Sequence, residues 1–79
     1  MDRSSILAGL QSADRREGHI IRVGAWSLRA DRVYRRGCPG PAWSRLYYAR
    51  RDGAQYEIGG WTSRLEAARV IVRIEAESR

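Results

Sequence analysis

The stretch WSRLYYARRDGAQYEIGGW, at residues 43–61, decides the fold. Its aromatic and β-branched residues are typical of strands, and the Asp52-Gly53 pair interrupts them. Asp-Gly is a favoured two-residue hairpin turn, because glycine tolerates the positive φ that a type I′ turn requires. We therefore predict antiparallel strands near residues 43–50 and 54–60.

This turn also predicts which side chains share a face of the sheet. Tyr47 would pair with Ile58, and side chains alternate along each strand. One face would hold Trp43, Tyr47, Ala49, Tyr56 and Ile58. The other would hold Leu46, Tyr48, Arg50, Gln55 and Glu57. We expect a helix to cover the first, apolar face and solvent or a partner to meet the second.

The remaining predicted elements precede and follow this hairpin in the sequence. Ser63 and Glu66 form a capping box at the start of a predicted helix over residues 63–77. Strands are predicted near 20–24 and 29–36, and a short helix near 3–15 at the edge of the core. The fold class is α+β, in one domain over residues 1–79. It has a three- or four-stranded antiparallel sheet packed on one face by the C-terminal helix, with a short N-terminal helix. Three strands and the last helix would form the compact unit.

The predicted strands put the three tryptophans in different environments. Trp43 and Trp61 lie within or beside predicted strands, so we expect them in the core. Trp26 falls between two predicted strands and would cover the sheet edge. Tyr48 is expected on the outer face, as surface packing or as a platform for a base.

The charge indicates an acidic partner. The chain has 79 residues, with 15 arginines and nine acidic residues, so its net charge is +6. A clustered positive field attracts phosphate-rich partners. The predicted nucleic-acid-binding set is Arg32, Arg35, Arg36, Arg45, Tyr48, Arg50, Arg51 and Gln55. The alternative is a solvated sheet edge, whose charges deter edge-to-edge aggregation.

Several function classes are not expected. Cys38 is the one cysteine and cannot form an internal disulfide or a Cys-rich zinc site. His19 has no partner at a recognisable catalytic spacing, so we predict no enzyme activity, no metal and no cofactor. No apolar run reaches membrane-spanning length, and the N-terminus does not read as a secretory signal. The expectation is a soluble cytoplasmic protein.

The stretch IGGWTSRLEAAR at residues 58–69 resembles the AP2 DNA-binding domain, where a third strand meets its capped helix. Trp43, 18 residues before Trp61, matches that family's second-strand tryptophan, and Arg35 and Arg36 match its basic first strand. The likeness covers residues 32–74, and it extends to the arm-binding domains of some phage and transposon integrases. It implies that the sheet face opposite the helix lies in the major groove of DNA. The reading positions fall on Leu46, Tyr48, Gln55 and Glu57.

Two functions are predicted from these residues. The first is a duplex-DNA-binding module, a regulator or recombination accessory of a bacterial or phage element. The second is a protein-binding adaptor or phage-type inhibitor of a host nucleic-acid machine. The second is motivated by Leu46, Tyr48 and Glu57, which stand where the family tends to carry arginine and tryptophan. In that case the N-terminal helix could dock a protein partner or form a homodimer.

Overall fold

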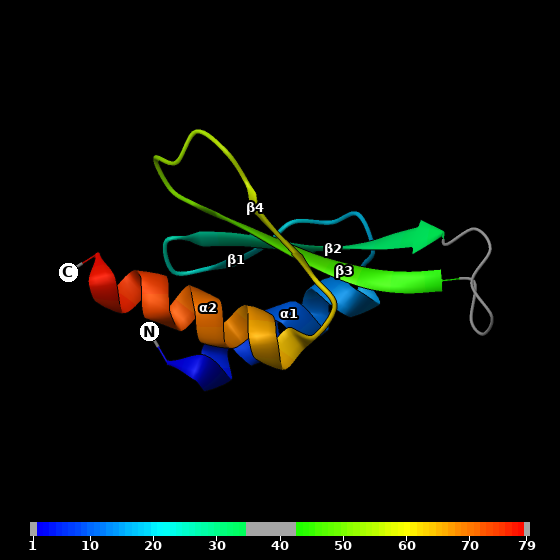
Figure 1. Ribbon diagram of the computed structural model, residues 1–79, viewed down its shortest axis with the longest axis horizontal. Helices are drawn as coiled ribbons and strands as arrows, with labels where there is room; N and C mark the ends of the chain where they lie inside the picture. The colour runs from blue at the N-terminus through cyan, green and yellow to red at the C-terminus, as the bar shows by residue number, and fades with distance from the viewer. Residues whose placement is uncertain (1, 35–42, 79) are drawn as a thin grey trace.

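Two helices cover one face of a four-stranded antiparallel sheet, and in the part of the chain that the structure describes the opposite face carries no helix (Figure 1). A computed structural model describes residues 2–34 and 43–78. In chain order the elements are α1 (Arg3–Arg15), β1 (Ile21–Val23), β2 (Trp26–Tyr34), β3 (Trp43–Arg51), β4 (Ile58–Trp61) and α2 (Arg64–Glu77). The prediction of an α+β fold with a helix at each end is confirmed.

The central feature of the sheet is a long ribbon made by β2 and β3. The two strands pair over nine residues each, from Trp26 opposite Arg51 to Tyr34 opposite Trp43. The strands on either side are much shorter, with three residues in β1 and four in β4. Because the outer strands are short, one end of the ribbon extends past the rest of the sheet (Figure 1).

Both helices begin at a side-chain cap. The Asp2 carboxylate accepts a 2.8 Å hydrogen bond from the backbone N–H of Ser5, which lowers the pKa of Asp2. The Ser63 hydroxyl accepts from the backbone N–H of Glu66, as the sequence predicted. A side-chain oxygen at this position satisfies an N–H group that the first helical turn leaves unpaired.

The core lies between the helices and the β2–β3 ribbon. Its fully buried members are Ile6, Leu10, Ala13, Leu28, Ala30, Ala49, Ala67, Ala68 and Ile71, joined by Trp26 and Tyr47. Helix α1 therefore belongs to the core, and the expectation that it packs at the edge is wrong. Gly9 explains how α1 comes so close, because a Cβ there would meet Val23 Cγ2 at 2.4 Å.

The hairpin between β3 and β4 differs from the predicted one in register. Ile58 pairs with Ala49, two residues further along β3 than the predicted partner Tyr47. A turn does form at Asp52-Gly53, with Gly53 at φ 85° and Ala54 N–H donating to Arg51 O over 3.0 Å. It is not the predicted type I′ turn, because that type needs a positive φ at both central residues and Asp52 does not have one. However, residues 52–57 all lie outside the strands, so the connection has six residues. A shift of two residues preserves the faces at Ile58 and Gly59, and Tyr47 and Ala49 are buried as predicted. An irregularity of the register between Tyr47 and Tyr48 then brings Trp61 opposite Tyr47.

The tryptophans exchange their predicted roles. Trp26 is the first residue of β2 and is 1% exposed, whereas Trp43 is 55% exposed. Trp61 is partly buried against the core.

Tyr56 and Ile58 were expected under the helix, but both are exposed. Tyr56 precedes the short edge strand β4, and Ile58 is its first residue.

Candidate functional site

The residues predicted to bind nucleic acid do not gather on one face. Tyr48 and Arg50 lie on the face without helices, because they alternate with the buried Tyr47 and Ala49. Three arginines point to the helix side: Arg32, Arg45 and Arg51. Gln55 is exposed between β3 and β4. Arg35 and Arg36 lie outside the described residues.

The helix-side arginines are engaged by carboxylates of the two helices and the segment that follows α1. Arg45 Nε lies 2.6 Å from Asp14 Oδ1, and Arg45 Nη1 lies 3.5 Å from Glu17 Oε2. Arg32 reaches the same Glu17 carboxylate at 3.3 Å. Asp14 Oδ1 and Arg45 Nη1 are buried without a well-aligned hydrogen bond, so this contact is chiefly one of charge. These ion pairs fasten the end of α1 to the ribbon.

A third carboxylate holds the other end of the ribbon. Glu75 of α2 lies 3.1 Å from Arg51 Nε and accepts a 2.9 Å hydrogen bond from the indole N–H of Trp26. Because this carboxylate joins a helix to two strands, Arg51 serves the packing of α2. The structure therefore gives Arg45 and Arg51 structural partners within the protein itself.

On the face without helices, which we call the outer face, all the charged side chains except Arg50 are paired with one another. Arg29 makes two hydrogen bonds to Glu57 at 2.7 and 2.8 Å, and these raise the pKa of Arg29. The hydrogen bonds between Arg22 and Asp52 at the rim raise the pKa of Arg22 and lower that of Asp52. With Arg50 and Asp31 added, three arginines face three carboxylates.

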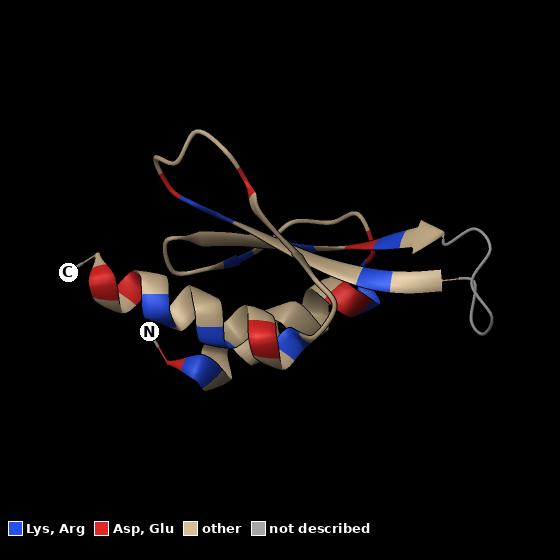
Figure 2. Cartoon of the chain, in the orientation of Figure 1, with Lys and Arg blue, Asp and Glu red and all other residues tan. Residues whose placement is uncertain are grey.

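The middle of the outer face is apolar and aromatic. The Arg29 guanidinium lies over the Tyr48 ring, 4.2 Å from its centroid. Leu46 and Val33 share this face and are partly exposed. A neutral surface with an apolar centre fits a protein partner better than a polyanion. Figure 2 shows the same mixing over the whole fold, with acidic and basic positions interspersed along helices and strands.

The excess positive charge nevertheless has a definite place in the chain. Residues 26–51, the β2–β3 ribbon with its connection, contain seven arginines and one acidic residue, a net charge of +6. Residues 1–25 contribute +1 and residues 52–79 contribute −1. This segment thus has a formal charge equal to that of the whole protein, and the strands β2 and β3 themselves supply +4 of it. Four of its arginines, Arg29, Arg32, Arg45 and Arg51, face carboxylates that belong to the other two segments.

At its far end the ribbon presents two aromatic side chains to solvent. Tyr34 and Trp43 are directly paired across the strands, and their rings meet edge to face with centroids 5.3 Å apart. They are 59% and 55% exposed. The Arg32 guanidinium lies 5.3 Å from the Trp43 ring centroid. We call Arg32, Tyr34 and Trp43 the tip cluster.

Sequence reasoning placed Arg32 in the binding set but missed both aromatic residues. Trp43 was assigned to the core because a tryptophan on a strand usually is. Its position beside the Gly/Pro-rich stretch at 37–41, far from the predicted helix, was the signal that could have placed it at a solvent-exposed end.

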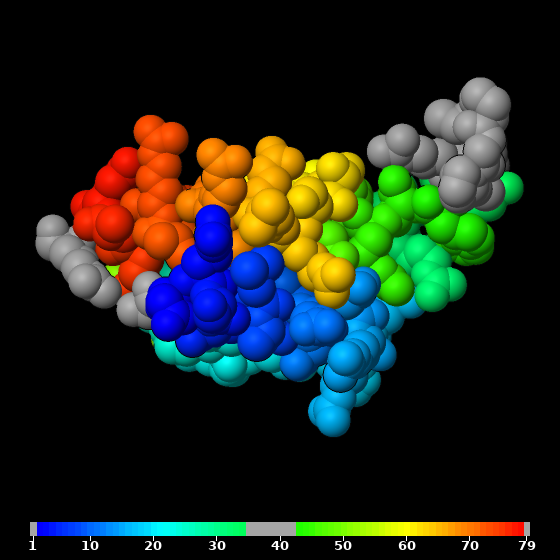
Figure 3. Space-filling model, turned by 90° about the horizontal axis from the view of Figure 1, so that it is seen from below, coloured from blue at the N-terminus to red at the C-terminus, as the bar shows by residue number. Residues whose placement is uncertain are grey.

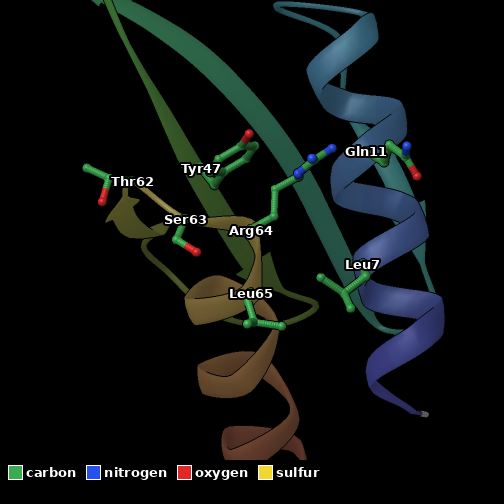
Figure 4. A pocket seen from close by; sticks show the side chains of 7 residues that line it. All are labelled: Leu7, Gln11, Tyr47, Thr62, Ser63, Arg64 and Leu65. Atoms are coloured by element: carbon green, nitrogen blue, oxygen red, sulfur yellow. The ribbon is translucent and has the colours of Figure 1, made fainter.

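A surface hollow opens between the N-terminal part of α2, α1 and the middle of β3 (Figure 4). Its lining is formed by Leu7, Gln11, Tyr47, Thr62, Ser63, Arg64 and Leu65. Burial, followed by the nearby Asp14 carboxylate, raises the pKa of Tyr47. Arg64 Nη1 lies 3.9 Å from Asp14 Oδ2, so its charge already faces a carboxylate. The hollow is lined by hydroxyl, amide and guanidinium groups and by two leucines.

Two further observations concern residues 2–34 and 43–78. No three His, Cys, Asp or Glu side chains there come together as metal ligands. Neither helix in this part of the chain has the length and apolar character needed to cross a membrane.

No family model, curated protein or solved structure matches the chain. The likeness to the AP2 domain and to integrase arm-binding domains therefore remains a prediction based on the residues themselves.

Proposed function

We propose that the protein is a small DNA-binding module whose contact element is the β2–β3 ribbon. The observation that carries this proposal is the net charge of +6 in residues 26–51, matched by near neutrality elsewhere. A two-stranded ribbon has dimensions that fit the major groove of duplex DNA. The proposal keeps the predicted partner but moves the contact from the centre of the sheet face to the arginines of the ribbon and its connection.

The arrangement of charges indicates backbone binding with little reading of bases. Arg29, Arg45 and Arg51 are held by carboxylates of the protein, which leaves them poorly placed to pair with base edges. Arg50 is exposed on the ribbon and has no carboxylate within ion-pair distance among the described residues. Arginines of this kind neutralise phosphates and give affinity that depends on salt more than on sequence.

The test is a salt series with a fluorescent duplex of about 20 base pairs, read by anisotropy. Each neutralised phosphate adds about 0.9 to the slope of log affinity against log salt. The double variant Arg35→Gln, Arg36→Gln should reduce the slope by up to about 1.8. A matched control with the same loss of charge is Arg3→Gln, Arg69→Gln, on the exposed sides of α1 and α2.

Two results would contradict the proposal. One is the absence of duplex binding at about 50 mM salt, where phosphate contacts are strong. The other is an equal loss of slope in the control variant, which would mean that duplex binding depends on the total charge of the protein and not on the arginines of the ribbon.

The outer face supports a second candidate, a protein-binding adaptor. Its charges are balanced, and its centre is formed by Val33, Leu46 and Tyr48. The double variant Leu46→Ala, Tyr48→Ala would then abolish capture of the partner while duplex binding stays unchanged. If this variant instead loses duplex binding, the outer face contacts DNA.

A further inference from the structure

The tip cluster is built from side chains that the fold does not need for its core. Tyr34 and Trp43 have the same strand parity as the buried Ala30 and Tyr47, so they point to the helix side. Helix α1 ends at Arg15, and the ion pairs of Glu17 with Arg32 and Arg45 mark the end of the covered region. Figure 3, seen from the helix side, shows the start of β3 (green) beside and beyond the helices.

Among residues 2–34 and 43–78, none that the structure describes hides this aromatic surface, which is open to a ligand on that side. In an edge-to-face pair one ring contributes only its edge, so both of its faces stay outside the contact. Burying an aromatic ring is strongly favourable, and these two rings remain more than half exposed. Such a pair is available for stacking without unfolding or rearranging the core.

The charge beside the rings indicates the kind of ligand. Arg32 lies over Trp43, and its own ion pair with Glu17 is 3.3 Å long between partly exposed side chains. Exposed pairs of this kind are weak, so a phosphate can compete for the guanidinium. An aromatic face with an arginine next to it is the combination that binds bases and backbone of a single strand.

We propose that the tip cluster stacks an unpaired base, so that the preferred substrate is a nucleic acid with single-stranded nucleotides. This inference rests on the proposed DNA binding and narrows it to strands, ends or gaps whose bases are not enclosed in a duplex. Bases within a regular duplex are stacked on each other and present no free face to Tyr34 or Trp43.

The experiment compares two probes on the same variants. One is a fluorescein-labelled oligothymidylate of about 20 nucleotides, and the other is the salt-series duplex. Trp43→Ala should weaken binding of the single strand by roughly 5- to 150-fold, the range measured for loss of one stacked base. Tyr34→Ala should weaken it in the same direction. Both variants should bind the duplex as the unaltered protein does.

Two controls make the comparison specific. Tyr56→Ala removes an aromatic side chain that is 74% exposed, beyond the opposite end of β3, and should change neither affinity. Trp43→Phe keeps an aromatic face and should retain most of the single-strand affinity. Oligothymidylate should quench tryptophan fluorescence in the unaltered protein, and this quenching should be lost in Trp43→Phe.

The outcomes separate the two proposals. If Trp43→Ala leaves single-strand affinity unchanged while the duplex still binds with a steep salt slope, the stacking site is refuted and DNA binding stands. Equal losses on both probes also refute it, because selectivity for unpaired bases is then absent. If neither probe binds at low salt, both proposals fail.

Discussion

Each end of the β2–β3 ribbon carries a tryptophan, but one tryptophan is buried and the other is exposed to solvent. Trp26 and Trp43 are each the first residue of a strand and point to the same side of the sheet. Trp26 lies over α2, donates its indole N–H to Glu75 and is 1% exposed. Trp43 lies past the end of α1 and is 55% exposed. Alternation decides which way a side chain points, but burial depends on whether a helix reaches that part of the strand.

The largest expected effect comes from truncating the two tryptophans in turn. Trp26→Ala should lower the free energy of unfolding by about 3–5 kcal/mol, because it removes the largest buried side chain. Trp43→Ala should lower it by less than about 1 kcal/mol, as expected at an exposed site. Urea denaturation followed by circular dichroism measures both.

A small domain has little stability to spare, so Trp26→Ala can abolish the cooperative transition altogether. Trp26→Phe keeps most of the apolar volume, so its free energy of unfolding should be measurable and should lie between those of Trp26→Ala and the unaltered protein. Equal destabilisation by Trp26→Ala and Trp43→Ala would show that the far end of the ribbon is packed, which contradicts the comparison.

The elements could be predicted from the sequence where local signals were strong. The Ser63 cap, the apolar spacing of Ile6 and Leu10, and the parity of β3 all follow from short-range physics. The register of β4 could not be predicted, because the hydrogen-bonded turn at Asp52-Gly53 is compatible with a longer loop before pairing starts. A shift of two residues in the pairing of β4 with β3 leaves the same side chains on each face. The alternation of apolar residues therefore cannot distinguish the two registers.

The candidate site was less predictable than the fold. The positive charge of the ribbon could be counted from the sequence, but its pairing could not. The contact of Arg45 with Asp14 joins residues that are far apart in the chain, and so does the contact of Arg29 with Glu57. Such pairs depend on how α1 and β4 lie against the ribbon, which composition and spacing do not determine.

A smaller effect is expected from the ion pairs that hold α1. Arg45→Met should destabilise the protein by about 1–2 kcal/mol, because it leaves the partly buried Asp14 carboxylate without its closest cation. The same change at Arg50, which is exposed on the other side of β3, should alter the free energy of unfolding by less than about 0.5 kcal/mol.

Thermal or urea unfolding of the two methionine variants tests this difference. They have the same net charge, so any general effect of removing an arginine cancels between them. If Arg50→Met proved the more destabilising change, the outer face would hold the ribbon more firmly than the helix side does.

The smallest expected effect is the pH dependence of the rim pair on the outer face. Hydrogen bonding to Arg22 lowers the pKa of Asp52 below its usual value of 3.8 in the folded protein. The folded state therefore favours the carboxylate, and the resulting stability is fully present above pH 3.8 and is lost as the pH falls through the folded pKa. Both side chains are about half exposed, so solvent and salt weaken the pair and keep the effect small.

Asp52→Asn removes this titration while keeping the size of the side chain. The loss of stability between neutral pH and pH near 3 should consequently be slightly smaller in the variant than in the unaltered protein, measured by urea unfolding at both pH values. Other carboxylates titrate over the same interval in both proteins, and the comparison cancels them. Equal losses in the two proteins would mean that Asp52 is not paired in solution, because an unpaired carboxyl has the same pKa in the folded and unfolded states. The outer face would then carry one more unpaired arginine, Arg22, beside Arg50, and more of its positive charge would be open to a polyanion.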